Sequence, residues 1–225
     1  MRILCVSDQI DPIVYSTAIR ERFRDVELVL SAGDLPMEYL SFIVSSLNKP
    51  LLFVFGNHNL NELSFYRPAA GQRLDRSLRW PFAGLEGNSG AIYTGFRVIR
   101  ESGLLILGLG GSIRYNGGLN QYTNAQMMFH ILLLLPKLLW NKVRYGRFVD
   151  IVLTHAPPAG IHDRSDPCHR GFRSFLWLMR VFRPRFLVHG HVHLYDLNSL
   201  RVSRYESTTV VNAFSHHVLE WDSST

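Results

Sequence analysis

Short apolar runs, each ending in polar residues, recur along the chain. They are rich in Val, Ile and Phe, as buried strands are. The runs lie at residues 3–6, 28–31, 51–55, 104–107, 151–153 and 186–188. Helical spacing at residues 13–23 and 35–47, between the first three runs, predicts a βαβαβ opening with a mostly parallel sheet.

Later segments show another pattern. Residues 91–99, 194–202 and 208–214 alternate or carry β-branched side chains, which predicts a second, more antiparallel sheet. Residues 60–90 contain Arg, Gly and Pro and predict a long irregular excursion. We therefore expect an α/β fold in which two sheets pack face to face under a cover of helices.

Composition narrows the class of protein. A chain of 225 residues that is 47% hydrophobic fits a single domain over residues 1–225. With Cys5 and Cys168 as the only cysteines, we expect neither a disulfide framework nor a thiolate metal site. The first apolar run is too short for a secretory signal, so we expect a cytoplasmic protein. The net charge of +6 is dispersed, which favours an anionic substrate or surface without excluding nucleic acid.

Five polar clusters directly follow apolar runs. They are Ser7-Asp8, Gly33-Asp34, Gly56-Asn57-His58, Thr154-His155 and the segment from His189 to His193. In open α/β sheets, ligands bind where strands end. Carboxylate, amide and imidazole ligands suit divalent ions such as Mn, Fe, Zn or Co. The clusters together predict a metal-dependent hydrolase.

Taken singly, most of these clusters have a structural explanation. Gly-Asp and Gly-Asn-His are common in turns, and His155 alone could be a structural histidine. His191 and His193 differ, because residues two apart on an extended segment point the same way, which suits a metal ion. His189 lies two residues before His191, so its side chain would point the same way. We expect it to support a metal ligand or to contact phosphate. The ordered occurrence of all five clusters is what indicates function.

The order Asp, Gly-Asp, Gly-Asn-His, His, Gly-His-x-His resembles the calcineurin-like metallophosphoesterase family, from Asp8 to His193. The resemblance implies a four-layer αββα sandwich that holds two divalent metal ions. In that family pattern Asp34 bridges both ions, Asn57, His155 and His191 complete the second site, and Asp8 and His193 belong to the first. It also implies hydrolysis of a phosphodiester or phosphomonoester, in a small molecule or a larger substrate.

The physical chemistry of such a site is plain. Two cations about 3.5–4 Å apart can clamp a phosphate and convert water to hydroxide near neutral pH. A bridging carboxylate such as Asp34 would hold that spacing, and Asn57 would coordinate without adding negative charge. His58 is the candidate to protonate the leaving oxygen or to stabilise the phosphoryl oxygens.

The chain departs from the family pattern at two positions. The first motif, Asp-x-His, is Asp8-Gln9-Ile10 here, and Ile10 cannot ligate a metal. We expect a weak first site, or one filled by oxygen from Gln9 or Asp11, which would favour Mn. Asn59 replaces the acidic residue that usually follows Gly-Asn-His, which would change the orientation or basicity of His58. These departures keep one alternative open, a catalytically weakened member that serves as a protein-binding scaffold.

Four further residues are candidates for substrate contact. Arg114 lies in the Gly-rich segment 110–116 and could pair with phosphate, although a plain turn with a solvated Arg explains it as well. His162 and His169 lie in the loop after His155, and His189 is the fourth.

The most apolar segment runs from Met127 to Trp140, with Lys142, Arg144 and Arg147 after it. It is too short to span a bilayer. We expect a kinked helix that packs on the core or forms a homodimer contact. The alternative is an interfacial helix whose basic flank meets anionic lipid, which would make the protein peripheral to a membrane.

Overall fold

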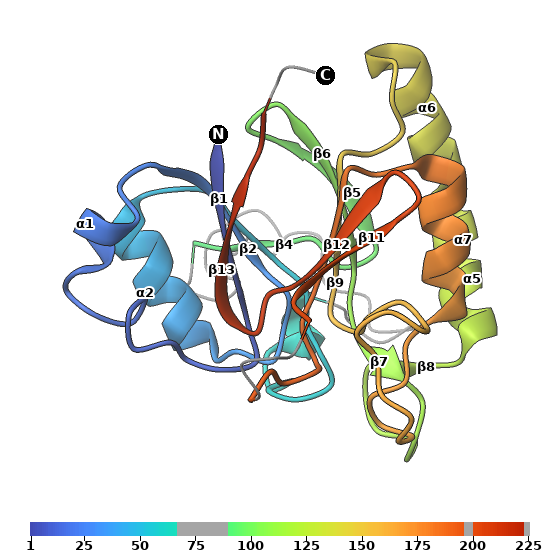
Figure 1. Cartoon of the computed structure of the whole chain (residues 1–225), viewed down its shortest axis with the longest axis horizontal. Helices are drawn as coiled ribbons and strands as arrows, with labels where there is room; N and C mark the ends of the chain where they lie inside the picture. The colour runs from blue at the N-terminus through green and yellow to red at the C-terminus, as the bar shows by residue number, and fades with distance from the viewer. Residues whose placement is uncertain (67–89, 196–199, 223–225) are drawn as a thin grey trace, which may run out of the picture.

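Two β-sheets lie face to face between two sets of helices (Figure 1). The computed structural model describes residues 1–66, 90–195 and 200–222. Most of the excursion predicted at 60–90 therefore lies outside the described residues. The four-layer αββα sandwich with two mixed sheets is confirmed.

The first sheet has parallel strands throughout, except for one antiparallel strand at its edge. In spatial order it consists of β13 (Ser215–Glu220), β1 (Arg2–Ser7), β2 (Val26–Ser31), β3 (Leu51–Phe53) and β4 (Ile92–Tyr93). The β1–β2, β2–β3 and β3–β4 pairs are parallel, and β13 is antiparallel to β1.

The second sheet has a parallel centre and antiparallel edges. In order it consists of β11 (Val202–Tyr205), β12 (Thr208–Asn212), β10 (Phe186–His189), β9 (Ile151–Thr154), β6 (Leu104–Leu109) and β5 (Arg97–Glu101). The outer pairs β11–β12 and β5–β6 are antiparallel. A small separate sheet pairs β7 (Ser112–Ile113) with β8 (Gln121–Tyr122).

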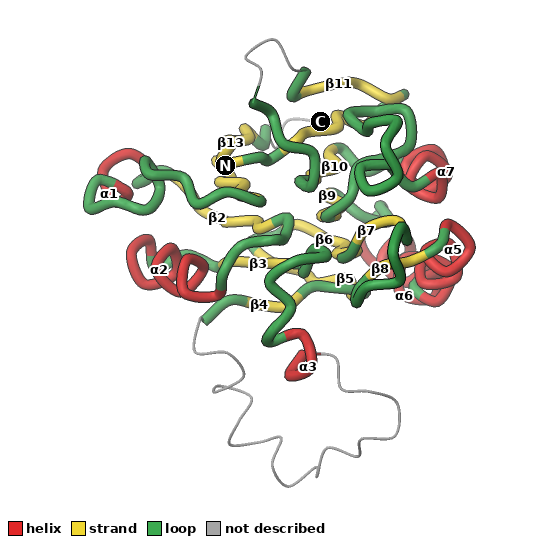
Figure 2. Tube along the Cα trace, turned by 90° about the horizontal axis from the view of Figure 1, so that it is seen from below, coloured by secondary structure: helices red, strands yellow, loops and turns green. Residues whose placement is uncertain are grey.

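Helices cover the outer face of each sheet. Figure 2 shows α1 and α2 on one side of the strands and α5, α6 and α7 on the opposite side. The helices are α1 (Ile19–Arg22), α2 (Met37–Leu47), α3 (Leu63–Tyr66), α5 (Asn124–Leu133), α6 (Leu135–Tyr145) and α7 (Arg173–Phe182).

Strand β1 shows why these apolar runs become strands. Successive side chains point to opposite faces of a sheet. Ile3 and Cys5 enter the core between the two sheets, whereas Leu4 and Val6 pack against the helix layer of α1 and α2. A third core lies between the second sheet and α5, α6 and α7. Because both faces are covered, nearly every residue of the strand must be apolar.

One expectation from the sequence is wrong, and another is confirmed only in part. The helix predicted at 13–23 is reduced to α1, because the Asp11 carboxylate accepts the N–H of Ile13 at 2.7 Å and fixes a turn there. The second sheet is more antiparallel than the first, with the pairs β11–β12 and β5–β6 against the single pair β1–β13 among the described strands, but β4 joins the first sheet and β12 lies parallel to β10. Alternation identifies a half-buried strand but does not determine its partner.

The predicted kink in the apolar segment is present. Helix α5 ends before Leu134, and α6 begins there with Pro136 in its first turn, where the missing N–H of proline costs nothing. Thr123 and Gln126 form a capping box at the start of α5. Among the described residues, no helix is both long and apolar enough to cross a bilayer.

Candidate metal centre

The predicted polar clusters meet where the strands of both sheets end. Asp8, Asp34 and Asn57 follow β1, β2 and β3, which are parallel neighbours. His155 and His191 follow β9 and β10, a parallel pair in the other sheet. The carboxyl ends of parallel strands lie at one edge of a sheet, so the packed sheets bring these side chains together.

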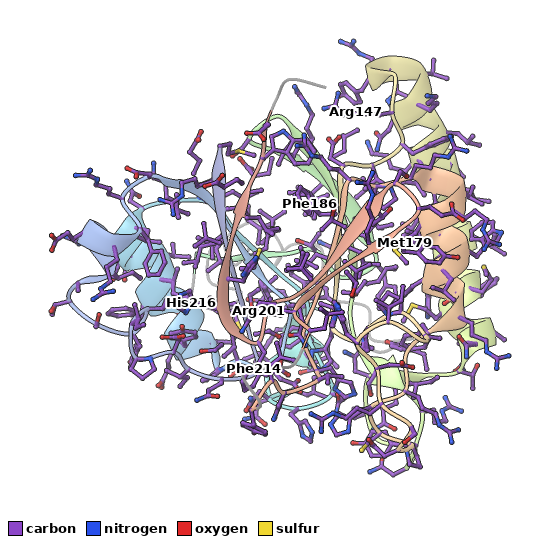
Figure 3. The ribbon with its side chains drawn as sticks, in the orientation of Figure 1. Arg147, Met179, Phe186, Arg201, Phe214 and His216 are labelled. Carbon is purple, nitrogen blue, oxygen red and sulfur yellow. The ribbon has the colours of Figure 1, made fainter. Side chains whose placement is uncertain are left out.

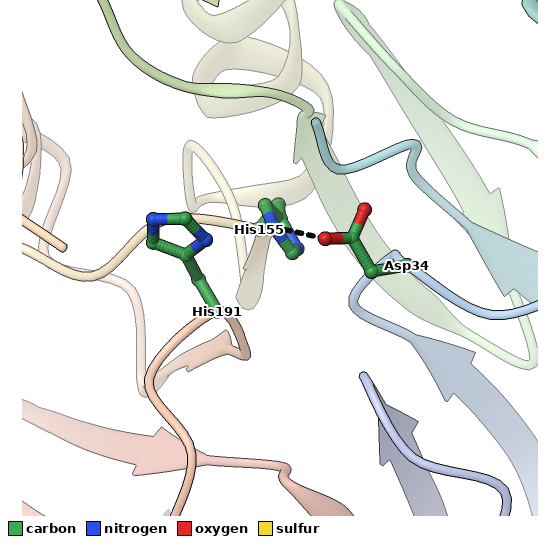
Figure 4. A group of neighbouring side chains, drawn as sticks. All are labelled: Asp34, His155 and His191. Atoms are coloured by element: carbon green, nitrogen blue, oxygen red, sulfur yellow. Dashed lines mark ion pairs between the residues drawn. The ribbon is translucent and has the colours of Figure 1, made fainter. Parts of the chain in front are cut away.

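Asp34, His155 and His191 form the middle of this cluster (Figure 4). One possible ligand atom from each lies within 4.8 Å of the others. Oδ2 of Asp34 is 3.2 Å from Nε2 of His155, and Oδ1 of Asn57 is 3.1 Å from the same nitrogen. Two oxygen donors and two imidazoles thus converge, which is a donor set that suits a divalent ion.

One ring nitrogen of His155 and one of His191 lie within hydrogen-bond distance of a backbone carbonyl oxygen. Nδ1 of His155 lies 2.8 Å from the carbonyl oxygen of Ala32, and Nε2 of His191 lies 2.6 Å from that of Cys168. Because a carbonyl oxygen only accepts, these nitrogens carry the proton in the neutral rings. Nε2 of His155 and Nδ1 of His191 then keep lone pairs, as in metal-ligating histidines.

The backbone is strained at the same positions. Asp8, Asp34 and His191 have φ angles of 64°, 58° and 66°. This left-handed conformation costs residues other than glycine roughly 1–2 kcal/mol each, and such strain gathers at functional sites. Gly56 permits a close approach there, because a Cβ at that position would overlap Oδ1 of Asp34.

Burial and charge set the protonation of the centre. Burial opposes the charged form of Asp34 and of His155, but their mutual attraction lowers the pKa of Asp34 to about 2 and raises the pKa of His155 to about 9. Burial, followed by the charge of His155, lowers the pKa of His191 to about 3. The metal-free centre therefore holds a buried ion pair beside a neutral imidazole, and a bound cation would replace the His155 proton as the partner of Asp34.

A second group of donors lies beside the first. Asp8 is buried, its Oδ2 accepts the N–H of His191 at 2.8 Å, and its Oδ1 is 3.9 Å from Nε2 of His193. The His193 ring stacks on Phe214 with centroids 4.9 Å apart, and its Nδ1 is 2.7 Å from the hydroxyl of Tyr195. These contacts direct Nε2 of His193 toward Asp8.

The histidine missing from the first motif is not replaced by its neighbours. The Ile10 side chain is 41% exposed, and Gln9 is exposed as well. The Asp11 carboxylate accepts from Ser215 Oγ and from Nδ1 of His216, the residue labelled in Figure 3, at 2.5 Å each, so it is already occupied. Asp11, one of the two residues predicted to substitute for the missing ligand, therefore stabilises the turn at Ile13 and the start of β13 instead.

The loop after β3 is fixed onto Asp34. The backbone N–H of His58 donates to Oδ1 of Asp34 at 2.8 Å, and Nδ2 of Asn59 donates to the Asp34 carbonyl oxygen at 3.0 Å. The amide nitrogen of Asn57 donates to the Tyr115 hydroxyl at 3.4 Å, which turns the amide oxygen toward His155. His58 itself is exposed.

The four predicted substrate contacts have different surroundings. Arg114 is exposed and donates to Gln126 at 3.1 Å. His189 is fully buried, with its Nε2 2.9 Å from Nδ1 of His162 and its Nδ1 2.9 Å from the Gly190 carbonyl oxygen, so its ring does not face an open surface. His162 also contacts Ser203 at 2.8 Å. The His169 ring lies beside that of His191, with centroids 5.2 Å apart.

A basic cavity of about 670 Å³ is lined mainly by the loop between His155 and α7. Arg164, Arg170 and Arg173 line it, and Arg164 donates to the carbonyl oxygen of His193 at 2.8 Å. Asp163, an acidic residue of the lining, accepts from two backbone N–H groups of its own loop. Sequence reasoning missed this group, because arginines in a loop carry no motif; their density between Arg164 and Arg173 was the available signal.

Comparisons with known proteins address the family and the fold. A family model for calcineurin-like phosphoesterases matches residues 1–195. One crystal structure aligns over 97% of this chain and 94% of its own, with 13% identity and a TM-score of 0.66. TT1561 of Thermus thermophilus aligns over 95% and 89%, with 11% identity and a TM-score of 0.61. GAP50, described as the anchor in the inner membrane complex of Plasmodium, aligns over 94% and 70%, with 12% identity and a TM-score of 0.52. No curated protein matches the chain by sequence.

Proposed function

We propose that this chain, which belongs to the calcineurin-like phosphoesterase family, is a divalent-metal-dependent phosphohydrolase. The observation that carries the proposal is the convergence of Asp34, Asn57, His155 and His191, in which the N–H of each imidazole donates to a backbone carbonyl oxygen and leaves the other ring nitrogen for a metal ion. When bound, divalent ions supply Lewis acidity that polarises phosphoryl oxygens and activates water.

The donor residues divide between two positions. Asn57, His155 and His191 would hold one ion, Asp8 and His193 would hold the other, and Asp34 would bridge them. Asp8 and His193 together supply one imidazole, whereas Asn57, His155 and His191 supply two. Ile10 offers no donor. The first ion is therefore bound more weakly, and its oxygen-rich surroundings favour Mn over Zn.

His58 acts on the leaving group. Its backbone is anchored to Asp34 and the residue is exposed, so a substrate that enters from solvent can reach its imidazole. An imidazole there can donate a proton to the leaving oxygen or a hydrogen bond to the phosphoryl group. Asn59 cannot orient it as a carboxylate would, because its amide donates to the Asp34 carbonyl oxygen.

The basic cavity supports an anionic substrate. Three arginines are among the residues that line a space of about 670 Å³, and one of them, Arg164, donates to the carbonyl oxygen of His193. Arginine pairs well with phosphate because its planar fork presents several donors. The substrate class is therefore a phosphodiester or phosphomonoester with further negative charge outside the scissile group.

The outer face of α5 and α6 supports attachment to an anionic lipid surface. Large exposed apolar side chains occur along both helices, at Phe129, Leu132, Leu133, Leu139, Trp140 and Val143. Residues 124–147 contain no Asp or Glu. Lys137, Lys142 and Arg144 accompany the apolar face, whereas Arg147 pairs with Asp150 at 2.6 Å. This pattern is typical of interfacial helices.

The decisive experiment measures the metal content of the purified protein together with Mn-supplemented hydrolysis of bis-p-nitrophenyl phosphate and p-nitrophenyl phosphate. We expect bound metal and turnover, both lost in Asp34→Asn. The matched control is Asp25→Asn, which removes an exposed carboxylate outside the polar clusters. The preferred ester distinguishes diesterase from monoesterase. Bound metal without turnover of either ester would favour the protein-binding scaffold.

A further inference from the structure

Three side chains of different donor type converge in the loop between His155 and α7. They are Asp166, Cys168 and His169, and one possible ligand atom from each lies within 4.8 Å of the others. We propose that this triad is a separate zinc site with a thiolate ligand, distinct from the centre built on Asp34. The sequence expectation of no thiolate site rested on the small number of cysteines and on their surroundings, and it overlooked the close Asp-x-Cys-His spacing.

The distances are close to those that zinc requires. Cys168 Sγ is 2.8 Å from Asp166 Oδ1 and 3.4 Å from His169 Nδ1, and Nδ1 is 2.8 Å from the same Oδ1. Tetrahedral zinc with arms of about 2.0–2.3 Å separates its ligand atoms by roughly 3.3–3.6 Å. The S–N separation already fits. The two contacts of Asp166 would lengthen by roughly half an ångström as an ion replaces the hydrogen bonds.

The turn itself prearranges the donors. The backbone N–H of His169 donates to Oδ1 of Asp166 at 3.1 Å, which closes the turn around Pro167. The side chains of Asp166 and His169 are 42% and 28% exposed, so an ion can enter from solvent and keep water as its fourth ligand. A preformed site loses less conformational freedom on binding than a flexible one.

Charge favours a dication here. Zinc binds cysteine as thiolate, so the Cys168 proton leaves to solvent when the ion binds. The thiolate and the Asp166 carboxylate then neutralise the two positive charges, and His169 binds through a neutral nitrogen. A neutral complex suits a loop that also carries Arg164 and Arg170. The mixed S, N and O donor set favours zinc over Mg or Ca.

An ion at the zinc site would stabilise the centre built on Asp34 without sharing its ligands. The Cys168 carbonyl oxygen accepts from Nε2 of His191 at 2.6 Å, and the rings of His169 and His191 are in contact. An ion on the Cys168 side chain fixes the position of that carbonyl, and thus the orientation of the His191 ring.

Cobalt substitution of the full-length protein tests the site directly. Thiolate-bound Co²⁺ gives an intense near-ultraviolet charge-transfer band that carboxylate, amide and imidazole ligands do not give. We expect this band in the wild type, its loss in Cys168→Ser, and at least a 10-fold weaker cobalt affinity in His169→Ala. Cys5→Ala is the matched control and should keep the band, because Cys5 is buried in the core between the sheets.

Asp34→Asn separates this site from the proposed catalytic centre. The band should survive that substitution while turnover is lost, so the two proposals can fail independently. No band in the wild type, a band that persists in Cys168→Ser, or a band lost in Asp34→Asn would each overturn the separate thiolate site. The wild-type spectrum keeps the proposal testable even if a variant folds poorly, because the absence of the band in the wild type would overturn the site.

Discussion

The backbone N–H of His191 donates to Oδ2 of Asp8 at 2.8 Å, which joins the first polar cluster of the chain to the last. Asp8 ends a strand of one sheet and His191 follows a strand of the other. The hydrogen bond therefore spans the two halves of the sandwich, and the geometry of the centre depends on how the sheets pack. Both residues adopt positive φ angles to make it.

Gly190 permits this contact and provides the first prediction. A Cβ at Gly190 would overlap Ser7 Oγ and Asp8 Oδ2. We expect Gly190→Ala to displace Asp8, to weaken metal binding at the first position and to lower the melting temperature. Calorimetry with and without added Mn measures both effects. Gly117→Ala is the control: it has open space around its Cβ and a φ of 74°, so only backbone strain of roughly 1–2 kcal/mol applies. Equal effects of the two variants would contradict the steric argument.

Ile10→His should restore an imidazole to the first metal position. Ile10 lies two residues after Asp8, and its exposed side chain leaves room for the ring. We expect tighter binding of the weaker Mn ion in a calorimetric titration, with little change at the stronger site. Ile13→His, at a similarly exposed isoleucine, should leave both affinities unchanged. An affinity that does not respond to Ile10→His would defeat the view that the lost histidine weakens this site.

The positions of Asp8, Asp34 and His155 were predictable because a polar residue after a run buried on both faces marks the end of a strand. The partners of the strands were not predictable, since the alternation and β-branched residues at 91–99 and 208–214 specify a half-buried surface and not the neighbouring strand. Contacts made by the backbone, such as the Cys168 carbonyl oxygen on His191, leave no trace in side-chain identity. They depend on tertiary structure alone.

His58→Gln tests the role of the exposed imidazole. A general acid contributes typically 10²- to 10⁴-fold, so we expect kcat to fall within that range while metal content stays at the wild-type value. His130→Gln, on α5, is the control and should retain full activity. A fall in metal content parallel to kcat would mean that His58 supports the ions and not the leaving group.

The metal-free protein should lose stability as the pH rises. The pKa of His155 is raised to about 9 by Asp34, against about 6.5 in the unfolded chain, so its stabilising contribution is complete below pH 6.5 and is lost toward pH 9. The loss is on the order of 3 kcal/mol. His189 and His191, whose pKa values are lowered to about 3, affect stability only below pH 6.5. Urea unfolding in chelator measures the slope, and Asp34→Asn should abolish it. A flat profile in the wild type would show that the ion pair does not form.

Attachment to lipid can be tested on the exposed face of α5 and α6. The Leu133 and Trp140 side chains are 60% and 58% exposed and lie on adjacent helices. We expect co-sedimentation with vesicles of mixed phosphatidylglycerol and phosphatidylcholine, and less with phosphatidylcholine alone, because both apolar burial and basic charge contribute. Leu133→Asp and Trp140→Ala should each reduce binding severalfold, and high salt should reduce it further. Val202→Asp, on β11, replaces an exposed apolar residue outside this face and should bind as the wild type does. If the face variants leave sedimentation unchanged but convert a dimer to a monomer in gel filtration, the surface binds a second copy of the chain and not a membrane.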